Sequence, residues 1–144
     1  MNKTIFTKTE KEEYKWFIVD ANERNLGRMS TEISKILLGK NKPTYNPSNP
    51  IKQSVIVINA EKVLVTGKKN KDKFYRRHSG RPGGLTIETF EELKKRIPNR
   101  IIEKSVKGML PKGRLGRSLF TNLKVFAGTS HPHSAQKPEV LNLE

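Results

Sequence analysis

The 144-residue sequence predicts a single α/β domain with a mostly parallel sheet of about four strands. Two apolar runs of strand length, at residues 14–20 and 54–59, flank a stretch in which apolar residues recur at helical spacing. A strand–helix–strand order of this kind favours a right-handed crossover and a parallel strand pair. With helices on both faces of the sheet, we expect a three-layer α/β/α domain.

The first predicted helix runs from Leu26 to Leu37, and Gly39 is its expected stop signal. A proline-rich loop is expected over residues 40–53, before the second strand. Residues 63–67 are short and apolar, which indicates either one helical turn or an extension of a strand.

The middle of the chain is rich in lysine, arginine and glycine. We expect a basic turn at residues 68–72 and a third strand at 73–78. Residues 80–84 contain three glycines and a proline, so they are expected to form a flexible loop.

A second helix is expected to begin at Thr86 or Thr89, and Thr89 with Glu92 matches a capping box. Pro98 should end this helix, because proline cannot continue it. Its expected apolar side consists of Ile87, Phe90, Leu93 and Ile97.

Asn99 is the predicted cap of a further helix, with Ile102, Val106 and Met109 turned inward. A short helix is expected over residues 115–123 and a last short strand over 124–127. The expected domain organisation is an N-terminal extension at 1–13, an α/β domain at 14–128 and an extended tail at 129–144.

The charge is strongly basic and unevenly distributed. Lysine and arginine total 29 against 14 acidic residues, a formal net charge of +15. Residues 61–87 contain eight basic and two acidic residues, and residues 104–128 contain six basic residues and no acid. Such clustering favours a surface that binds a polyanion, with nucleic acid first and an anionic membrane surface second. The alternative is a solvated basic face that serves solubility.

Composition excludes several other classes of protein. No stretch has the length and hydropathy of a membrane span, and the absence of cysteine excludes disulfides and thiolate zinc sites. The first residues lack the features of a secretory or transit peptide, so we expect the protein to work where it is made, or in an organelle that encodes it.

Enzyme chemistry is poorly supported. Residues 108–115 have the glycine spacing of a phosphate-binding loop, but Arg114 and Leu115 stand where lysine and Ser/Thr are needed. His131 and His133 are only two imidazoles without a third metal ligand. We therefore predict no catalytic residues, no metal, no cofactor and no small-molecule substrate.

Nucleic-acid binding is better supported. Residues 68–81 interleave basic side chains with Phe74 and Tyr75, one of which should point into the core if the segment is a strand. Residues 104–124 place basic side chains around glycine-rich turns. Because no recognition helix is evident, folded RNA fits these loops better than duplex DNA does.

Several motifs in order resemble one family, the bacterial-type large-subunit ribosomal protein L13, over about residues 14–141. The motifs lie at residues 14–21 with 26–28, at 57–63 with 66–67, at 106–112 with 115–117, at 123–128 and at 131–133. The resemblance implies a three-layer α/β/α fold, no catalytic activity and direct binding to large-subunit ribosomal RNA early in assembly. The implied partners are that RNA and neighbouring ribosomal proteins, with no membrane.

The matched positions imply RNA-facing roles for Arg28, Lys107, Lys112, Arg114, Arg117, Lys124, His131 and His133. The charge pattern adds Lys40, Lys42, Lys68, Lys69, Lys71, Lys73, Arg76, Arg77, His78 and Arg81.

Residues 76–84 resemble the cyanobacterial and plastid branch, which favours a plastid stroma and leaves the bacterial cytoplasm as the alternative. Residues 48–53 depart from the family, which usually has a histidine and an Asp-x-Gly-Asp run there, so no contact of that loop is carried over. Two rival functions are a nucleotide-dependent enzyme, which needs a nucleotide pocket with a magnesium ligand, and a non-specific DNA-binding protein.

Overall fold

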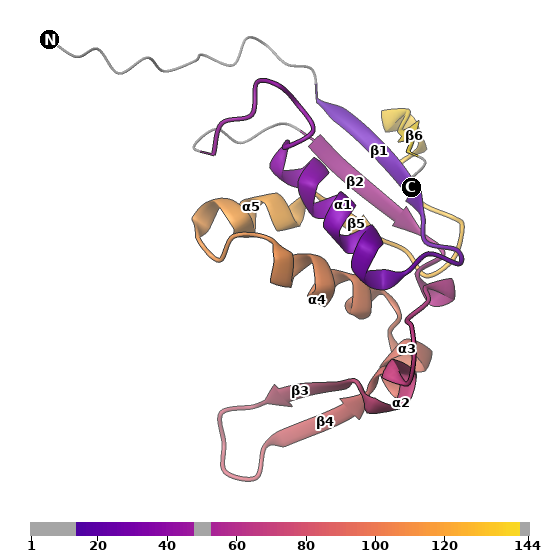
Figure 1. Ribbon diagram of the computed structural model, residues 1–144, viewed down its shortest axis with the longest axis vertical. Helices are drawn as coiled ribbons and strands as arrows, with labels where there is room; N and C mark the ends of the chain where they lie inside the picture. The colour runs from indigo at the N-terminus through magenta and orange to yellow at the C-terminus, as the bar shows by residue number, and fades with distance from the viewer. Residues whose placement is uncertain (1–13, 48–52, 142–144) are drawn as a thin grey trace, which may run out of the picture.

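The central sheet of the computed structural model contains four strands in the order β5–β2–β1–β6, and every neighbouring pair is parallel (Figure 1). The structure describes residues 14–47 and 53–141. The expected N-terminal extension and residues 48–52 of the divergent loop lie outside them. The strands are β1 (Lys15–Asp20), β2 (Gln53–Ile58), β5 (Leu123–Val125) and β6 (Glu139–Val140). The α/β fold with a mostly parallel sheet is therefore confirmed.

Helix α1 (Leu26–Leu38) joins β1 to β2, as the sequence predicts. It ends at Gly39, whose φ of 76° lies in the left-handed region that glycine tolerates best. The N–H of Gly39 donates to the carbonyl of Ile36 at 2.8 Å and so satisfies one of the last helical carbonyls.

The hydrophobic core lies between one face of the sheet and the helices. Helix α1 packs against α4 (Asn99–Met109), and the chain continues into α5 (Arg114–Thr121) on the left-hand side of the view in Figure 1. Helix α3 (Phe90–Arg96) adds two buried residues. Fully buried core residues include Val19, Ile33, Leu37, Val55, Val57, Phe90, Leu93, Ile101, Ile102 and Val106.

The other face of the sheet, where the three-layer expectation placed helices, is covered partly by the chain after β5. Alternation along β1 places Trp16 opposite the face that carries Phe17. The Trp16 ring stacks on His133 with centroids 5.4 Å apart, and Phe126 lies 5.8 Å from the same histidine. The covering segment contains the 3₁₀ turn Ser134–Gln136 and leads into β6, which pairs with β1.

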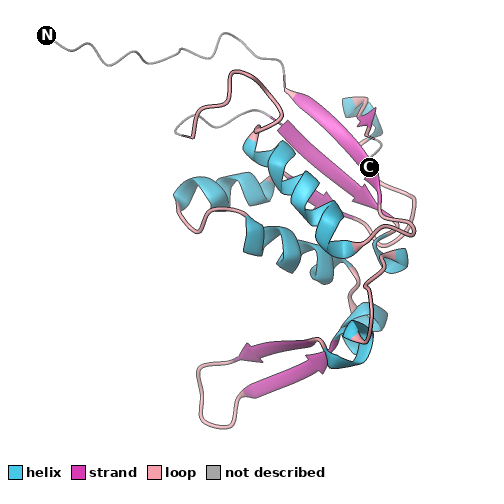
Figure 2. Ribbon diagram, viewed as in Figure 1, coloured by secondary structure: helices cyan, strands magenta, loops and turns pink. Residues whose placement is uncertain are grey.

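The third predicted strand exists but does not join the central sheet. Strand β3 (Phe74–His78) pairs antiparallel with β4 (Leu85–Thr89) in a separate two-stranded sheet (Figure 2). The sequence-based assignment of Ile87 to the apolar side of a helix is wrong, because this residue lies in β4 and is 50% exposed. Positive φ angles at Gly80 and Gly83 close the hairpin between the strands.

Three local predictions also need correction. Residues 69–72 form a single helical turn, α2 (Lys69–Asp72), and not only a turn. Asn99 is the first residue of α4 and makes no capping bond, because Pro98 occupies the cap position. Met109 is 43% exposed and does not point into the core.

Other local predictions are confirmed. Thr89 and Glu92 form the capping box of α3: the Thr89 hydroxyl accepts from the Glu92 N–H at 3.3 Å, and the Glu92 carboxylate accepts from the Thr89 N–H at 2.8 Å. Leu64 forms an isolated parallel bridge with Asn25, so the 63–67 segment is strand-like. Within the described residues, no helix has the length and hydropathy needed to cross a membrane.

Candidate RNA-binding surface

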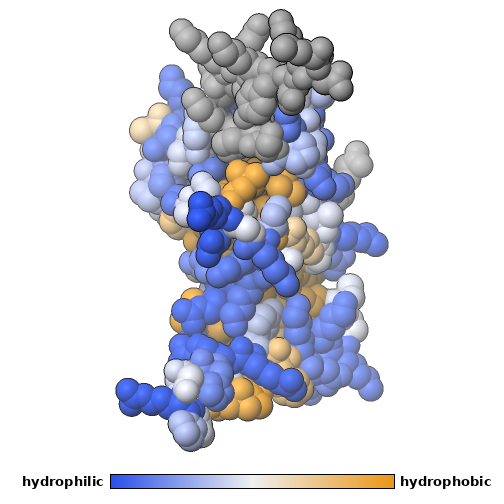
Figure 3. Space-filling view, turned by 90° about the vertical axis from the view of Figure 1, so that its left-hand side faces the viewer, coloured by the Kyte–Doolittle hydropathy of each residue, from blue (hydrophilic) through white to orange (hydrophobic). Residues whose placement is uncertain are grey.

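The two basic segments lie next to each other in the fold. Residues 61–87 supply α2 and the β3–β4 hairpin, and residues 104–128 supply the end of α4, α5 and β5. The hairpin loop and the α4–α5 connection extend toward the same side of the molecule (Figure 1). Seen from that side, hydrophilic side chains cover most of the described surface, with apolar patches between them (Figure 3). Lys104 of α4 joins the two segments, because its Nζ lies 4.9 Å from the Tyr75 ring centroid.

The predicted RNA-facing side chains are placed where a polyanion has access to them. All are exposed except Lys42, His131 and His133, which are half-buried. In chain order they come from the first turn of α1 (Arg28), the loop after α1 (Lys40, Lys42), α2 and its flanks (Lys68, Lys69, Lys71, Lys73), β3 (Arg76, Arg77, His78), the hairpin loop (Arg81), α4 (Lys107), the α4–α5 loop (Lys112), α5 (Arg114, Arg117), β5 (Lys124) and the segment after it (His131, His133).

Ion pairing distinguishes the two basic segments from residues 88–103, which contain four basic and four acidic residues. There Arg96 grips Glu88 through two 2.7 Å bonds, and Lys95 pairs with Glu91 at 2.8 Å. In the described parts of the chain, no lysine or arginine of residues 61–87 or 104–128 forms an ion pair. A solvated basic face that serves solubility usually mixes charges of both signs. The unpaired cations therefore favour a binding surface.

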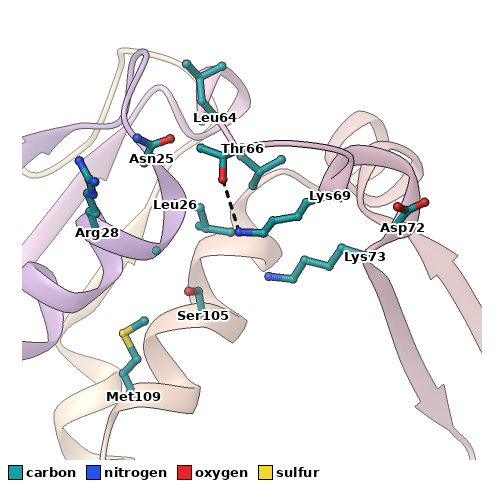
Figure 4. A pocket seen from close by; sticks show the side chains of 12 residues that line it. Asn25, Leu26, Arg28, Leu64, Thr66, Lys69, Asp72, Lys73, Ser105 and Met109 are labelled. Atoms are coloured by element: carbon teal, nitrogen blue, oxygen red, sulfur yellow. Dashed lines mark hydrogen bonds between the residues drawn. The ribbon is translucent and has the colours of Figure 1, made fainter.

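An open cleft of about 700 Å³ lies between the start of α1, residues 64–66, α2 and α4 (Figure 4). Lys69 and Lys73 extend into it from the α2 side, and the Lys69 ammonium donates to the Thr66 hydroxyl at 3.4 Å. Arg28 stands at its α1 rim. Asp72 is the one acidic residue in the lining, so the cleft carries a net positive charge that suits a phosphate.

The cleft does not provide the groups that a nucleotide-dependent enzyme needs. One carboxylate at Asp72, in a lining otherwise basic or uncharged, offers neither an acid–base pair nor a magnesium site. Among the residues that the structure describes, no three His, Cys, Asp or Glu side chains gather as a metal site. The chemistry that this arrangement favours is anion binding.

The two faces of the hairpin differ in their environment. Tyr75 points toward the helices, with its ring 6.5 Å from Phe90, and burial raises the pKa of its hydroxyl. Phe74 points outward and is 53% exposed, so the alternation expected for this strand is confirmed. The outward face also presents Arg76 beside Ile87 and His78 beside Leu85. The two apolar residues were not predicted on this face, although their period-two spacing signals a strand.

The packing of α5 against the α4–α5 loop depends on Gly116. A Cβ on this residue would overlap the carbonyl oxygen of Pro111 and lie 2.7 Å from its carbonyl carbon. The glycine therefore lets α5 approach the α4–α5 loop closely, beside the pocket that Lys112 and Arg117 help to line. The sequence identifies this glycine only as part of a motif, because its contact is tertiary.

The two tail histidines already have aromatic neighbours in the chain. His133 lies against Trp16 and Phe126, and the His131 ring lies 6.4 Å from Phe126. These contacts fix the segment after β5 against the sheet, so the histidines have a packing role in addition to any contact with RNA.

Comparison with known proteins agrees with the geometry. The family model of "Ribosomal protein L13" matches residues 14–132. A protein of Cyanothece sp. named "Large ribosomal subunit protein uL13" is 62% identical over 144 residues, which cover 100% of this chain and 97% of the relative. Proteins of the same name from Crocosphaera subtropica and Synechocystis sp. are 60% and 57% identical, over 99% and 98% of this chain and 95% and 93% of the relatives. The chain therefore belongs to the ribosomal protein L13 family, whose members are structural and non-enzymatic.

Proposed function

We propose that this chain is a structural constituent of the large ribosomal subunit, that it binds large-subunit ribosomal RNA directly and that it supports early assembly of the subunit. The names of its relatives support the place in the ribosome. The observation that carries RNA binding is the set of exposed cations in residues 61–87 and 104–128, which form no ion pairs in the described structure. When such cations bind phosphates, counterions are released from the RNA, and this makes the affinity depend on salt.

The shape of the surface favours folded RNA over duplex DNA. The cations come from a projecting hairpin, a single-turn helix, a loop and the short helix α5 (Figure 1). DNA readers usually present one recognition helix to a major groove. An irregular surface of loops and turns suits the loops, bulges and grooves of a folded RNA. The proposed RNA-binding domain spans residues 14–128, with neighbouring ribosomal proteins as further partners.

Substitution of two α5 arginines tests direct RNA binding. We expect Arg114→Ala and Arg117→Ala each to weaken binding of a large-subunit ribosomal RNA transcript by about 1 kcal/mol or more. Each should also reduce the slope of log affinity against log salt by roughly one, because one phosphate contact is lost. Filter binding at several salt concentrations measures both quantities.

The matched control is Lys95→Ala. It removes the same charge from an exposed helix position, but its partner Glu91 is on the protein and the residue lies outside the basic segments. Its RNA affinity and salt slope should equal those of the unaltered protein. If both arginine variants also match the unaltered protein, direct binding through α5 is wrong.

We infer the cellular compartment of this protein from the organisms of its relatives. All three relatives named above are cyanobacterial, which favours the bacterial cytoplasm over the plastid stroma that the sequence-based prediction preferred. Locating the gene on a bacterial chromosome or on a plastid genome distinguishes the two.

A further inference from the structure

A pocket of about 270 Å³ lies between the end of α4, the α4–α5 loop and α5. Its walls are mainly apolar and come from Leu110, Pro111 and Phe120. Its remaining lining residues are Lys107, Lys112, Arg117 and Gly116. The lining therefore contains three cations and no acid, in a segment that has no acidic residue from 104 to 128.

Phosphate binding alone does not explain this pocket. Phosphates are bound by cations and N–H groups, which need no apolar hollow. A nucleobase is flat and apolar on both faces, and proteins bind unpaired nucleobases of RNA by stacking them on aromatic side chains. An apolar hollow surrounded by cations matches the two parts of one nucleotide, its base and its phosphate.

We propose that this pocket takes a single unpaired nucleobase of the ribosomal RNA, stacked on Phe120, while Lys107, Lys112 and Arg117 bind the phosphates on either side of it. This inference rests on the proposed function, because it concerns how the RNA is held.

The ring of Phe120 is positioned for such contact. Phe120 is half-buried and packs against the core, so the ring is held in place. Phe120 lines the pocket, and the Lys107 ammonium lies over its ring, 5.6 Å from the centroid, so the ring already takes part in a cation–π contact. A base that stacks on this ring replaces the Lys107 ammonium, which then pairs with an adjacent phosphate instead of the ring.

The shape of the pocket is determined by a core side chain and by a close backbone contact. Leu110 is 5% exposed and belongs to the hydrophobic core. Gly116 holds α5 against Pro111, where any larger residue would overlap the carbonyl oxygen. The pocket is thus formed before RNA binds, which reduces the ordering cost of binding.

The rival occupant is an apolar side chain of a neighbouring ribosomal protein. Such a side chain fits the walls, but its backbone brings no charge to match three cations. A nucleotide brings a phosphate on each side, so charge complementarity favours RNA.

The experiment compares Phe120→Ala, Phe120→Leu and Phe120→Tyr in the full-length protein, with a full-length large-subunit ribosomal RNA transcript as the probe. Loss of one stacked base should weaken binding about 5- to 150-fold in the alanine and leucine variants. The salt slope should stay unchanged, because no phosphate contact is lost. The tyrosine variant should bind as the unaltered protein does, because its ring still stacks.

Phe120→Leu guards against a folding artefact, because leucine keeps apolar packing against the core. Its circular dichroism spectrum and thermal melting are measured alongside. Chemical probing of unpaired nucleobases adds a second readout: the unaltered protein should protect at least one nucleobase that the leucine variant leaves reactive.

Three outcomes overturn the inference. Equal affinity and protection in the unaltered protein and the leucine variant mean that no base occupies the pocket. A fall in salt slope on Phe120→Leu means that the ring only positions the cations. If Phe120→Leu weakens binding only when other ribosomal proteins are added to the RNA, a protein side chain is the occupant. RNA binding itself stands in each case if Arg114→Ala and Arg117→Ala still weaken it, and it fails if they do not.

Discussion

Gly116→Ala is expected to destabilise the protein, because the added Cβ has no room. It would overlap the Pro111 carbonyl oxygen and lie 2.7 Å and 3.2 Å from the carbonyl carbon and Cα of the same residue. These are backbone atoms, so no side-chain rotation relieves the contact. To restore an ordinary carbon–oxygen contact, α5 or the α4–α5 loop must shift by on the order of 1.5 Å.

The expected cost is about 1–3 kcal/mol, as for other overpacked positions. For a domain of this size, that lowers the melting temperature by roughly 2–4 °C for each kcal/mol. Urea unfolding followed by circular dichroism, together with thermal melting, measures both quantities without RNA.

Gly113→Ala is the matched control, three residues earlier in the same segment. A Cβ added to Gly113 would have no atom within 4 Å, and the φ of −76° at this residue is open to any side chain. The substitution weakens the N-cap of α5 but reduces the entropy of the unfolded chain, so the net change should stay within about 0.5 kcal/mol. Equal stability of the Gly116→Ala and Gly113→Ala variants would refute the close approach of α5 to Pro111.

Three further predictions concern stability. Gly108 lies at an exposed position in α4 with open space around it, so Gly108→Ala should raise the free energy of unfolding by about 1 kcal/mol. Urea unfolding that shows no gain in stability would contradict a helix at this residue. Asn59→Ala should cost about 1–3 kcal/mol, because Asn59 has a φ of 56° and donates to the Asp20 carboxylate at 2.8 Å; Asn59→Gly should cost less in the same assay, since glycine tolerates that φ. The Asn59 bond and the N–H of Asn22 hold the pKa of Asp20 below its usual value, so the carboxylate stabilises the fold above about pH 4 and loses this effect as the pH falls. The unaltered protein should therefore lose more stability than Asp20→Asn between about pH 5 and pH 2, and parallel pH profiles would refute this.

The sequence predicts the central part of the fold because its signals are local and strong. The apolar run of β2, the 3.6-residue spacing of α1 and the stop at Gly39 all agree with one another. The capping box of Thr89 with Glu92 is one of the two helix starts that the sequence predicts, and the structure confirms it over Thr86. Consistency between pattern, cap and stop signal explains this success.

The missed elements depend on contacts between distant parts of the chain. Strand β4 was missed because Ile87 fits the apolar spacing of the following helix as well as that of a strand. Strand β6 has two residues, and only its pairing with β1 defines it. The cap at Asn99 was misplaced because Pro98 takes the position before the helix, which proline favours near helix starts.

The candidate site likewise combines features with a local sequence signal and features that depend on tertiary contacts. The exposure of the cations could be predicted from residue type, because lysine and arginine are rarely buried without a partner, and the choice of RNA-facing residues used the charge pattern and the family resemblance together. The cleft beside Lys69 and the pocket beside Phe120 were not predicted, since each forms where separate helices meet.

Sedimentation of a native lysate on a sucrose gradient tests the central claim most directly. The protein is followed across the fractions at moderate salt and after a high-salt wash. We predict that it migrates with the large ribosomal subunit under both conditions, because high salt weakens the phosphate contacts but not the apolar contacts of a protein that is built into the subunit. A position at the top of the gradient, without ribosomal RNA, would contradict a structural role in the ribosome.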